Sequence, residues 1–107
     1  MAKPKKQIQG SRNQMIVQQE INGSKGGFYI EQLGERTAEM TYSWAGTDKF
    51  IIDHTYVSDT LRGQGVGRHL LDAAVSYARA QRVKIIPLCP FAKSVFDKDP
   101  DIRDVLV

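Results

Sequence analysis

A glycine-rich loop with a basic residue near each end is the segment of this sequence with the clearest chemistry. It reads Leu-Arg-Gly-Gln-Gly-Val-Gly-Arg over residues 61–68 and stands between an apolar run and a helical pattern. The first amide N–H groups of a helix lack partners within the helix, and the helix dipole is positive at that end. Glycines let an anion approach these amides without meeting a side chain. The loop therefore predicts a phosphate site.

Two basic side chains strengthen this prediction, and two rival phosphate motifs fit the loop less well. Arg62 and Arg68 would add full charges beside the amides. A P-loop requires Gly-Lys followed by Ser or Thr, which the segment lacks. A dinucleotide fingerprint that began at Gly65 would require a glycine where Leu70 stands. A tight glycine turn without a ligand stays open as the alternative, because short glycine motifs also arise by chance.

Cys89 and His54 are the candidates for covalent and acid–base chemistry. Cys89 directly precedes Pro90, which suits the first turn of a helix, and a helix N-terminus favours the thiolate form of cysteine. A thiolate can accept an acyl group and pass it to an amine, while a histidine can act as a base or proton shuttle. An inert core cysteine and a structural histidine are the alternatives. In a regular strand Asp53 points to the opposite face from His54, so we do not expect it to orient the ring.

The apolar pattern predicts strands first and helices later. Period-two alternation and apolar runs indicate five strands, at residues 15–21, 28–33, 37–44, 50–57 and 83–88. In the first of them Met15, Val17 and Ile21 would share the inner face. Steps of three and four between apolar residues predict a helix over 65–81, and a shorter helix at 91–97 and a final turn at 101–106 follow. The last two strands flank the long helix as one βαβ unit and should be parallel.

The composition describes one compact domain with a basic N-terminal segment. The chain has 107 residues, 41% hydrophobic and 25% charged, which leaves no core for a second domain. The net charge of +3 comes from four residues of the first 13, namely Lys3, Lys5, Lys6 and Arg12. We therefore expect a basic flexible tail over 1–13 and a folded domain over 14–107. A nucleic-acid-binding arm is the alternative for the tail, although no aromatic residue supports it.

Other classes of protein are disfavoured by features that the sequence lacks. Its single cysteine cannot form an intramolecular disulfide, and there is neither a signal peptide nor a long apolar run that could cross a membrane. We expect a cytoplasmic protein without a metal, in which Cys89 is a free thiol.

The glycine loop resembles the pyrophosphate loop of the GNAT acetyltransferases, Gln/Arg-x-x-Gly-x-Gly/Ala, at Arg62, Gly65 and Gly67. More narrowly, residues 35–107 resemble the small Yjdj-type GNAT-like proteins. That resemblance is carried by His-Thr-Tyr-Val at 54–57, Leu-Arg-Gly-Gln-Gly at 61–65 and Pro-Leu-Cys-Pro-Phe at 87–91. It implies a mixed α+β fold, with antiparallel N-terminal strands followed by two parallel strands that splay apart to admit the pantetheine arm of acetyl-CoA. It also favours Cys89 and His54 as catalytic residues.

The resemblance implies which residues bind coenzyme A. Backbone groups near Tyr56 and Val57 would hold the pantetheine arm, and the amides of residues 63–68 would hold the pyrophosphate. The full implied set is Tyr56, Val57, Arg62, Gly63, Gln64, Gly65, Val66, Gly67, Arg68 and Phe91. This placement agrees with the rule that ligands of open α/β sheets lie beyond the carboxyl ends of parallel strands.

Two departures from larger GNAT enzymes bear on function. Only the short segment 22–27 separates the first two expected strands, where larger relatives place two helices that help form the acceptor site. No tyrosine follows Tyr77, although many members of the superfamily protonate the departing CoA thiolate with one.

From these features we expect a minimal acetyltransferase that moves an acetyl group from acetyl-CoA to an amine, directly or through a thioester on Cys89. The sequence does not identify the amine. A second copy of the chain or another partner could complete the acceptor site. A CoA-binding or sensing module without turnover is the alternative.

Overall fold

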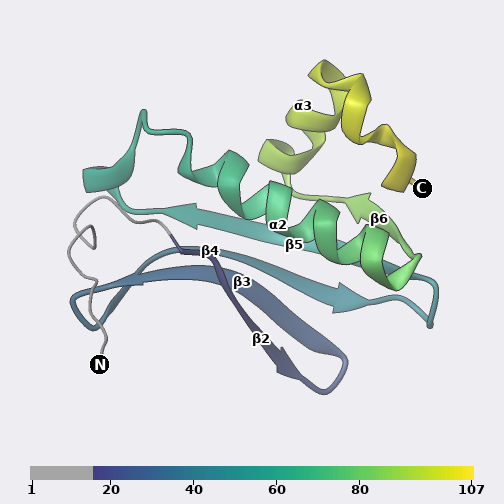
Figure 1. The fold of residues 1–107 in the computed structure, drawn as a ribbon, viewed down its shortest axis with the longest axis horizontal. Helices are drawn as coiled ribbons and strands as arrows, with labels where there is room; N and C mark the ends of the chain where they lie inside the picture. The colour runs from purple at the N-terminus through teal and green to yellow at the C-terminus, as the bar shows by residue number, and fades with distance from the viewer. Residues whose placement is uncertain (1–15) are drawn as a thin grey trace, which may run out of the picture.

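A computed structural model describes residues 16–107, which form a five-stranded mixed sheet with the helices on one side (Figure 1). The strands are β2 (Gln18–Asn22), β3 (Lys25–Gln32), β4 (Glu35–Trp44), β5 (Lys49–Val57) and β6 (Lys84–Pro87). They lie side by side in chain order. The pairs from β2 to β5 are antiparallel, and β5 and β6 are parallel. The expected mixed sheet is confirmed.

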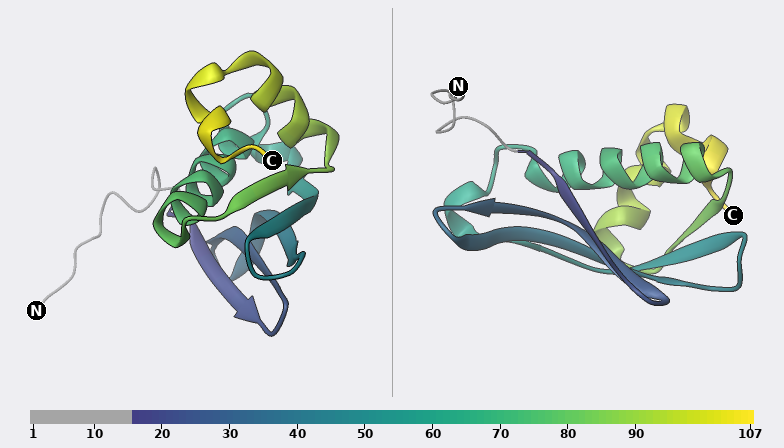
Figure 2. Two further views of the ribbon diagram at one scale, coloured as in Figure 1. Left: turned by 90° about the vertical axis from the view of Figure 1, so that its right-hand side faces the viewer. Right: turned by 60° about the horizontal axis from the view of Figure 1, so that its bottom comes forward.

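The long helix α2 (Val66–Gln81) connects β5 to β6, which confirms the βαβ unit. It lies along one face of the sheet, with the shorter helix α3 (Pro90–Lys98) beside its N-terminal half (Figures 1 and 2). Residues 16–107 also contain two 3-10 segments, η2 (Asp59–Leu61) before α2 and η3 (Pro100–Val105) after α3. The predicted helical segments are therefore present, with small differences at their ends.

The core lies between the sheet and α2, as the alternation of β4 predicts. Ala38, Met40 and Tyr42 are buried on the helix side. Aromatic rings from three strands and the helix pack together there, from Phe28, Tyr42, Trp44, Phe50 and Tyr77. The methionine and aromatic stripe of β4 is therefore part of the packed core.

The N-terminal strand differs from its prediction. β2 covers Gln18–Asn22, and all five residues are exposed, including Ile21, which was expected to face inward. A two-residue turn at Gly23 and Ser24 joins it to β3, so β3 begins at Lys25 rather than three residues later. Among the described residues β2 is an edge strand, and Gln19 is the side chain of β2 that reaches the core, by donating a hydrogen bond to the hydroxyl of Tyr42. Met15 and the predicted basic tail lie outside the described residues.

An irregularity in β5 changes which side chains face the helices. Tyr42 pairs with Ile52, but Thr41 pairs with His54, so Asp53 is an extra residue in β5. The Asp53 carboxylate accepts a hydrogen bond from the Thr41 hydroxyl, on the face of the sheet opposite to α2. His54 shares this face, because directly paired antiparallel residues point to the same side. The expectation that Asp53 and His54 point to opposite faces is therefore wrong.

Candidate functional site

The two parallel strands separate after a short stretch of pairing. The last paired residues are Ile52 and Pro87. The Ile52 carbonyl then accepts hydrogen bonds from the amides of both Leu88 and Cys89, at 3.1 and 3.0 Å. Beyond this point the chain turns from β6 into α3, whereas β5 continues to Val57. The splayed strands implied by the family resemblance are therefore confirmed.

The free edge of β5 at this opening carries backbone groups from alternate residues. The amide of Ser58 donates to the carbonyl of Thr37 at 2.8 Å, so this is a hydrogen-bonded pair of the β4–β5 ladder. Hydrogen-bonded and non-hydrogen-bonded pairs alternate along antiparallel strands, so the amide and carbonyl groups of Thr55 and Val57 point toward the opening. The backbone of Tyr56 points to β4, and its side chain shares the face of His54. Of the two residues predicted to hold the pantetheine arm, only Val57 has its backbone amide and carbonyl directed toward the opening.

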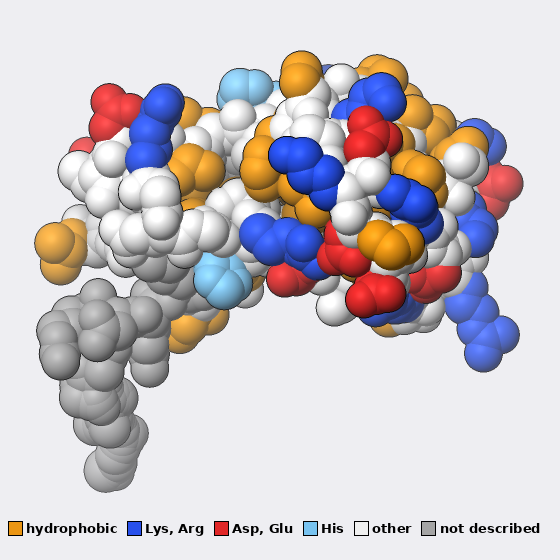
Figure 3. All heavy atoms as spheres, turned by 90° about the horizontal axis from the view of Figure 1, so that it is seen from above, with side chains coloured by type: hydrophobic (Ala, Val, Ile, Leu, Met, Phe, Trp, Pro, Cys, Tyr) orange, Lys and Arg blue, Asp and Glu red, His pale blue; other side chains and the backbone are white. Residues whose placement is uncertain are grey.

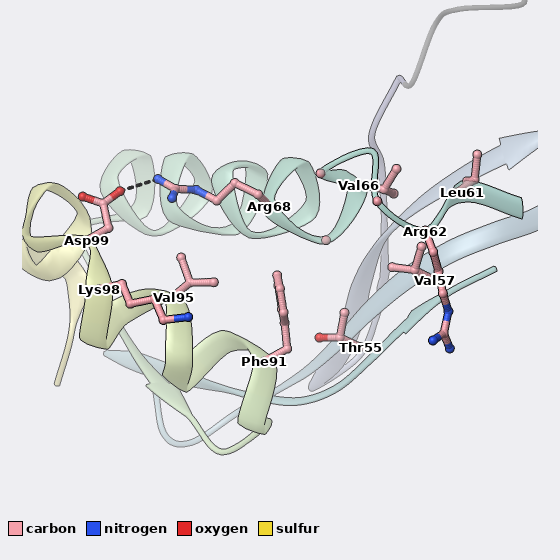
Figure 4. Close-up of a pocket in the computed structure, with 13 residues that line it drawn as sticks. Thr55, Val57, Leu61, Arg62, Val66, Arg68, Phe91, Val95, Lys98 and Asp99 are labelled. Carbon is pink, nitrogen blue, oxygen red and sulfur yellow. Dashed lines mark hydrogen bonds and ion pairs between the residues drawn. The ribbon is translucent and has the colours of Figure 1, made fainter. Parts of the chain in front are cut away.

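A cavity of about 570 Å³ opens beside this edge, between the end of β5, the glycine loop and the facing sides of α2 and α3 (Figure 4). Its volume is within the range typical of sites for small molecules and cofactors. Eight of the ten residues that the resemblance implies for coenzyme A line this cavity, all but Tyr56 and Gln64.

The glycine loop presents free amides to the cavity. Gly63 and Gly65 have φ angles of +81° and +72°, a left-handed conformation that most other residues avoid. Gly65 caps α2 and has no side chain to accept from the first helical amides, those of residues 66–68. Within the described part of the chain the N–H groups of Gly63, Gln64 and Gly65 also find no acceptor. This end of the cavity can therefore accept an anion.

Gly67 is required for a different reason, since a side chain there would collide with Phe91. The Gly67 backbone is buried, and an added Cβ would lie 2.8 Å from the Cζ atom of the Phe91 ring. The ring projects from α3 toward the first turn of α2 and forms part of the cavity wall (Figure 4). The third glycine of the loop therefore sets how closely the two helices approach each other.

The two arginines of the loop differ from their predicted role. Arg68 runs along α2 to the far end of the cavity, where it pairs with Asp99 and with Asp72 (Figure 4). The hydrogen bonds that Arg68 donates to these two carboxylates raise its pKa above the ordinary value, and the contact with Arg68 lowers the pKa of Asp99. Arg62 is mainly exposed and pairs with Asp59 at 2.9 Å. The loop amides, rather than free cations, are therefore the main groups available to an anion at this end of the cavity.

Charges of both signs alternate over the helix-bearing face of the domain, and no large area of one sign is visible there (Figure 3). Within residues 16–107 no group of histidine, cysteine and carboxylate side chains could hold a metal ion. None of the helices in this range is long and apolar enough to cross a membrane.

The two predicted catalytic residues do not meet. Cys89 caps the N-terminus of α3, as expected, but its side chain is only 5% exposed and lies behind the cavity wall. Its Sγ is 3.1 Å from Oγ1 of Thr55, which does line the cavity. His54 points from the opposite face of the sheet, away from the cavity.

Sequence reasoning missed Thr55 and the far end of the cavity at Val95, Lys98 and Asp99. Thr55 stands between His54 and Tyr56 in a motif that the sequence analysis did single out. Its place within this motif was the sequence signal that could have identified it as a residue of the site. Recognising it required the extra residue in β5, which places Thr55 on the helix side of the sheet. No local pattern brings Asp99 to the first turns of α2.

A mixed sheet whose parallel strands separate beside a glycine loop at a helix start defines an acetyltransferase-type fold. The family model for GCN5-related N-acetyltransferases matches residues 27–105, and the chain belongs to this family. No protein of curated function matches the chain in sequence. The narrower resemblance to the Yjdj-type proteins stays a prediction.

Solved structures agree with the family assignment. A GCN5-like protein from Staphylococcus aureus, studied by NMR, is 41% identical, with a TM-score of 0.67 over 84% of this chain and 87% of that one. A ribosomal-protein-alanine N-acetyltransferase from Brucella melitensis shares the fold at 16% identity and a TM-score of 0.61, over 72% of this chain and 62% of its own. A GNAT acetyltransferase from Elizabethkingia anophelis, with acetyl-CoA bound, is 17% identical at a TM-score of 0.53, over 60% of this chain and 42% of its own.

Proposed function

We propose that the protein transfers an acetyl group from acetyl-CoA to a primary amine. The observation that carries this proposal is the opening between β5 and β6, which leads directly into the cavity lined by the free amides of the glycine loop. The acetyl-CoA seen in a structural relative supports the same choice of substrate. The amides of residues 63–68 would hold the pyrophosphate of acetyl-CoA. The backbone groups of Thr55 and Val57 would pair with the amides of the pantetheine arm, as an added strand does.

The acetyl group would then lie where β6 leaves β5, within reach of an incoming amine. The sequence leaves open whether the amine attacks acetyl-CoA directly or whether Cys89 first accepts the acetyl group. A nucleophile must reach the carbonyl carbon, but the Cys89 side chain is nearly buried behind Thr55. We therefore propose direct attack by the amine.

The proposed activity is tested by following CoA release from acetyl-CoA with a thiol reagent, in the presence of small amines, amino acids and short peptides with free N-termini. We expect saturable release with at least one of these acceptors and acetylation of its amino group by mass spectrometry. Calorimetric binding of acetyl-CoA without release by any acceptor would instead identify a CoA-binding module. If acetyl-CoA does not bind, the cavity assignment itself is wrong.

The route is tested by incubating the protein with acetyl-CoA in the absence of an amine and measuring its intact mass. Direct transfer predicts no acetylated protein. An acetyl adduct that hydroxylamine removes, and that Cys89→Ala lacks, would establish the thioester route instead. Acetyl-CoA affinity should stay within about twofold in Cys89→Ala, because Cys89 does not line the cavity and deletion of one near-buried sulfur is a local change.

A further inference from the structure

Thr55 separates the thiol of Cys89 from the cavity. Oγ1 of Thr55 and Sγ of Cys89 are 3.1 Å apart, and either atom can be the donor. Thr55 lines the cavity, whereas Cys89 is 5% exposed and does not. The threonine hydroxyl therefore offers a path for a proton between the buried thiol and the cavity.

Two features of the backbone hold this pair at the opening between the strands. The extra residue at Asp53 returns Thr55 to the helix side of the sheet, opposite Met40, instead of the exposed side. Cys89 is fixed by its own amide, which donates to the Ile52 carbonyl at 3.0 Å. The hydroxyl and the thiol thus lie at the point where β6 leaves β5, which is where the thioester would be placed.

The departing sulfur requires a hydrogen-bond donor, and few of the side chains that line the cavity can supply one. Among the described residues that line it, Thr55 alone carries a hydroxyl. The charged donors are distant or engaged, since Arg68 pairs with Asp99, Lys98 precedes Asp99 at the same far end of the cavity, and Arg62 is exposed on the loop. No tyrosine follows Tyr77 in the chain that could serve instead.

We propose that Thr55 is a catalytic residue whose hydroxyl donates to the departing CoA sulfur, with the thiol of Cys89 as the proton source behind it. The proposal rests on the proposed function and gives Cys89 a role other than that of a nucleophile.

The proton movements balance in this step. The amine nitrogen forms a bond to the acetyl carbon, the carbon–sulfur bond breaks, and its electron pair stays on the sulfur of CoA. The Thr55 proton moves to that sulfur while the Cys89 proton moves to Thr55 Oγ1. The resulting Cys89 thiolate regains a proton from water, and the nitrogen of the product loses one to water.

The test titrates the thiol of bound CoA and requires no amine. The absorbance of the thiolate near 240 nm is followed against pH for the CoA complex, and the desulfo-CoA complex is subtracted to remove the signal of Cys89. A hydroxyl that donates to the thiolate favours its formation, so Thr55→Val should raise the pKa of the bound CoA thiol by about 1. Thr55→Ser should behave as the parent, because it keeps the hydroxyl.

A matched control and a kinetic measurement complete the test. Thr41→Val removes a hydroxyl from the neighbouring strand on the opposite face and should leave the CoA titration unchanged. With an accepting amine, Thr55→Val should lower kcat about 10- to 100-fold at nearly constant KM for acetyl-CoA, and Thr55→Ser should restore it. Adding Cys89→Ala to Thr55→Val should cause little further loss, since the two groups act in series.

The outcomes separate this inference from the proposed function. Normal CoA affinity with the same thiol titration in Thr55→Val and the parent would overturn the role of Thr55 and leave the CoA site intact. Acetylation of Cys89 itself would also overturn it, because the thiol would then be the nucleophile. If CoA does not bind to the parent protein, the proposed function fails and the inference fails with it.

Discussion

Replacing Gly65 with aspartate is expected to abolish binding of acetyl-CoA while the fold persists. Gly65 caps α2 with φ of +72°, and a Cβ there would meet no other atom within 4 Å. The new carboxylate would therefore stand in open space beside the loop amides. Like charges about 4 Å apart near a protein surface repel by several kcal/mol, so affinity should fall at least about 100-fold. Calorimetric titration measures the loss, and circular dichroism checks the fold.

Gly65→Asn is the matched control for this change. Asparagine and aspartate have nearly the same size, and both tolerate the left-handed backbone better than other residues. The asparagine variant should therefore retain much more affinity than the aspartate variant, which isolates the effect of charge. Equal and unchanged affinities in both variants would show that the pyrophosphate does not bind at this helix start.

Gly67→Ala is expected to destabilise the protein and weaken acetyl-CoA binding, although alanine is normally the better helix former. The added Cβ would lie 2.8 and 3.0 Å from two atoms of the Phe91 ring, so α3 or the ring must move. Overpacking of this kind typically costs about 1–3 kcal/mol. Because the ring lines the cavity, we expect affinity to fall about tenfold or more. Denaturant unfolding and calorimetry measure the two effects.

Replacing the Phe91 ring with a smaller side chain should reduce the loss of stability that Gly67→Ala causes. In a Phe91→Leu background the smaller side chain leaves room for the new methyl group, so Gly67→Ala should then cost less than in the parent. The two substitutions should therefore be strongly non-additive, as expected for residues in contact. If Gly67→Ala alone is as stable as the parent and binds acetyl-CoA equally well, the close approach of α2 to Phe91 is not required.

Local patterns predicted the elements whose geometry is regular. Strict alternation defined β4 from residues 37–44, and steps of three and four defined α2 to within one residue. The glycine loop was placed correctly at the start of α2, because glycines mark left-handed turn positions directly. Cys89 was likewise placed before a helix because Pro90 marks helix starts.

The errors arose where one residue or a distant contact changed the outcome. Alternation along 50–57 assumed a regular strand, so the extra residue at Asp53 reversed the faces assigned to the residues after it. Arg68 was assigned to the loop because it is close in sequence, whereas its carboxylate partner Asp99 is brought near by the packing of α3 against α2. Val17 packs against the core as alternation predicted, but Ile21 on the same expected face is exposed, because alternation does not show whether a helix covers the strand.

The extra residue in β5 determines which reactive side chain faces the cavity. The face of the sheet to which each of residues 54–57 points is fixed by the residue of β4 with which it pairs, and that pairing follows from Asp53 being the extra residue. If Asp53 instead paired directly with Thr41, as in a regular strand, the imidazole of His54 would turn toward the cavity and the hydroxyl of Thr55 toward the opposite face. Which side chain faces the cavity thus depends on whether Asp53 is left unpaired between Ile52 and His54. A one-residue shift in strand register, without any substitution, would therefore exchange a hydroxyl at the cavity for an imidazole.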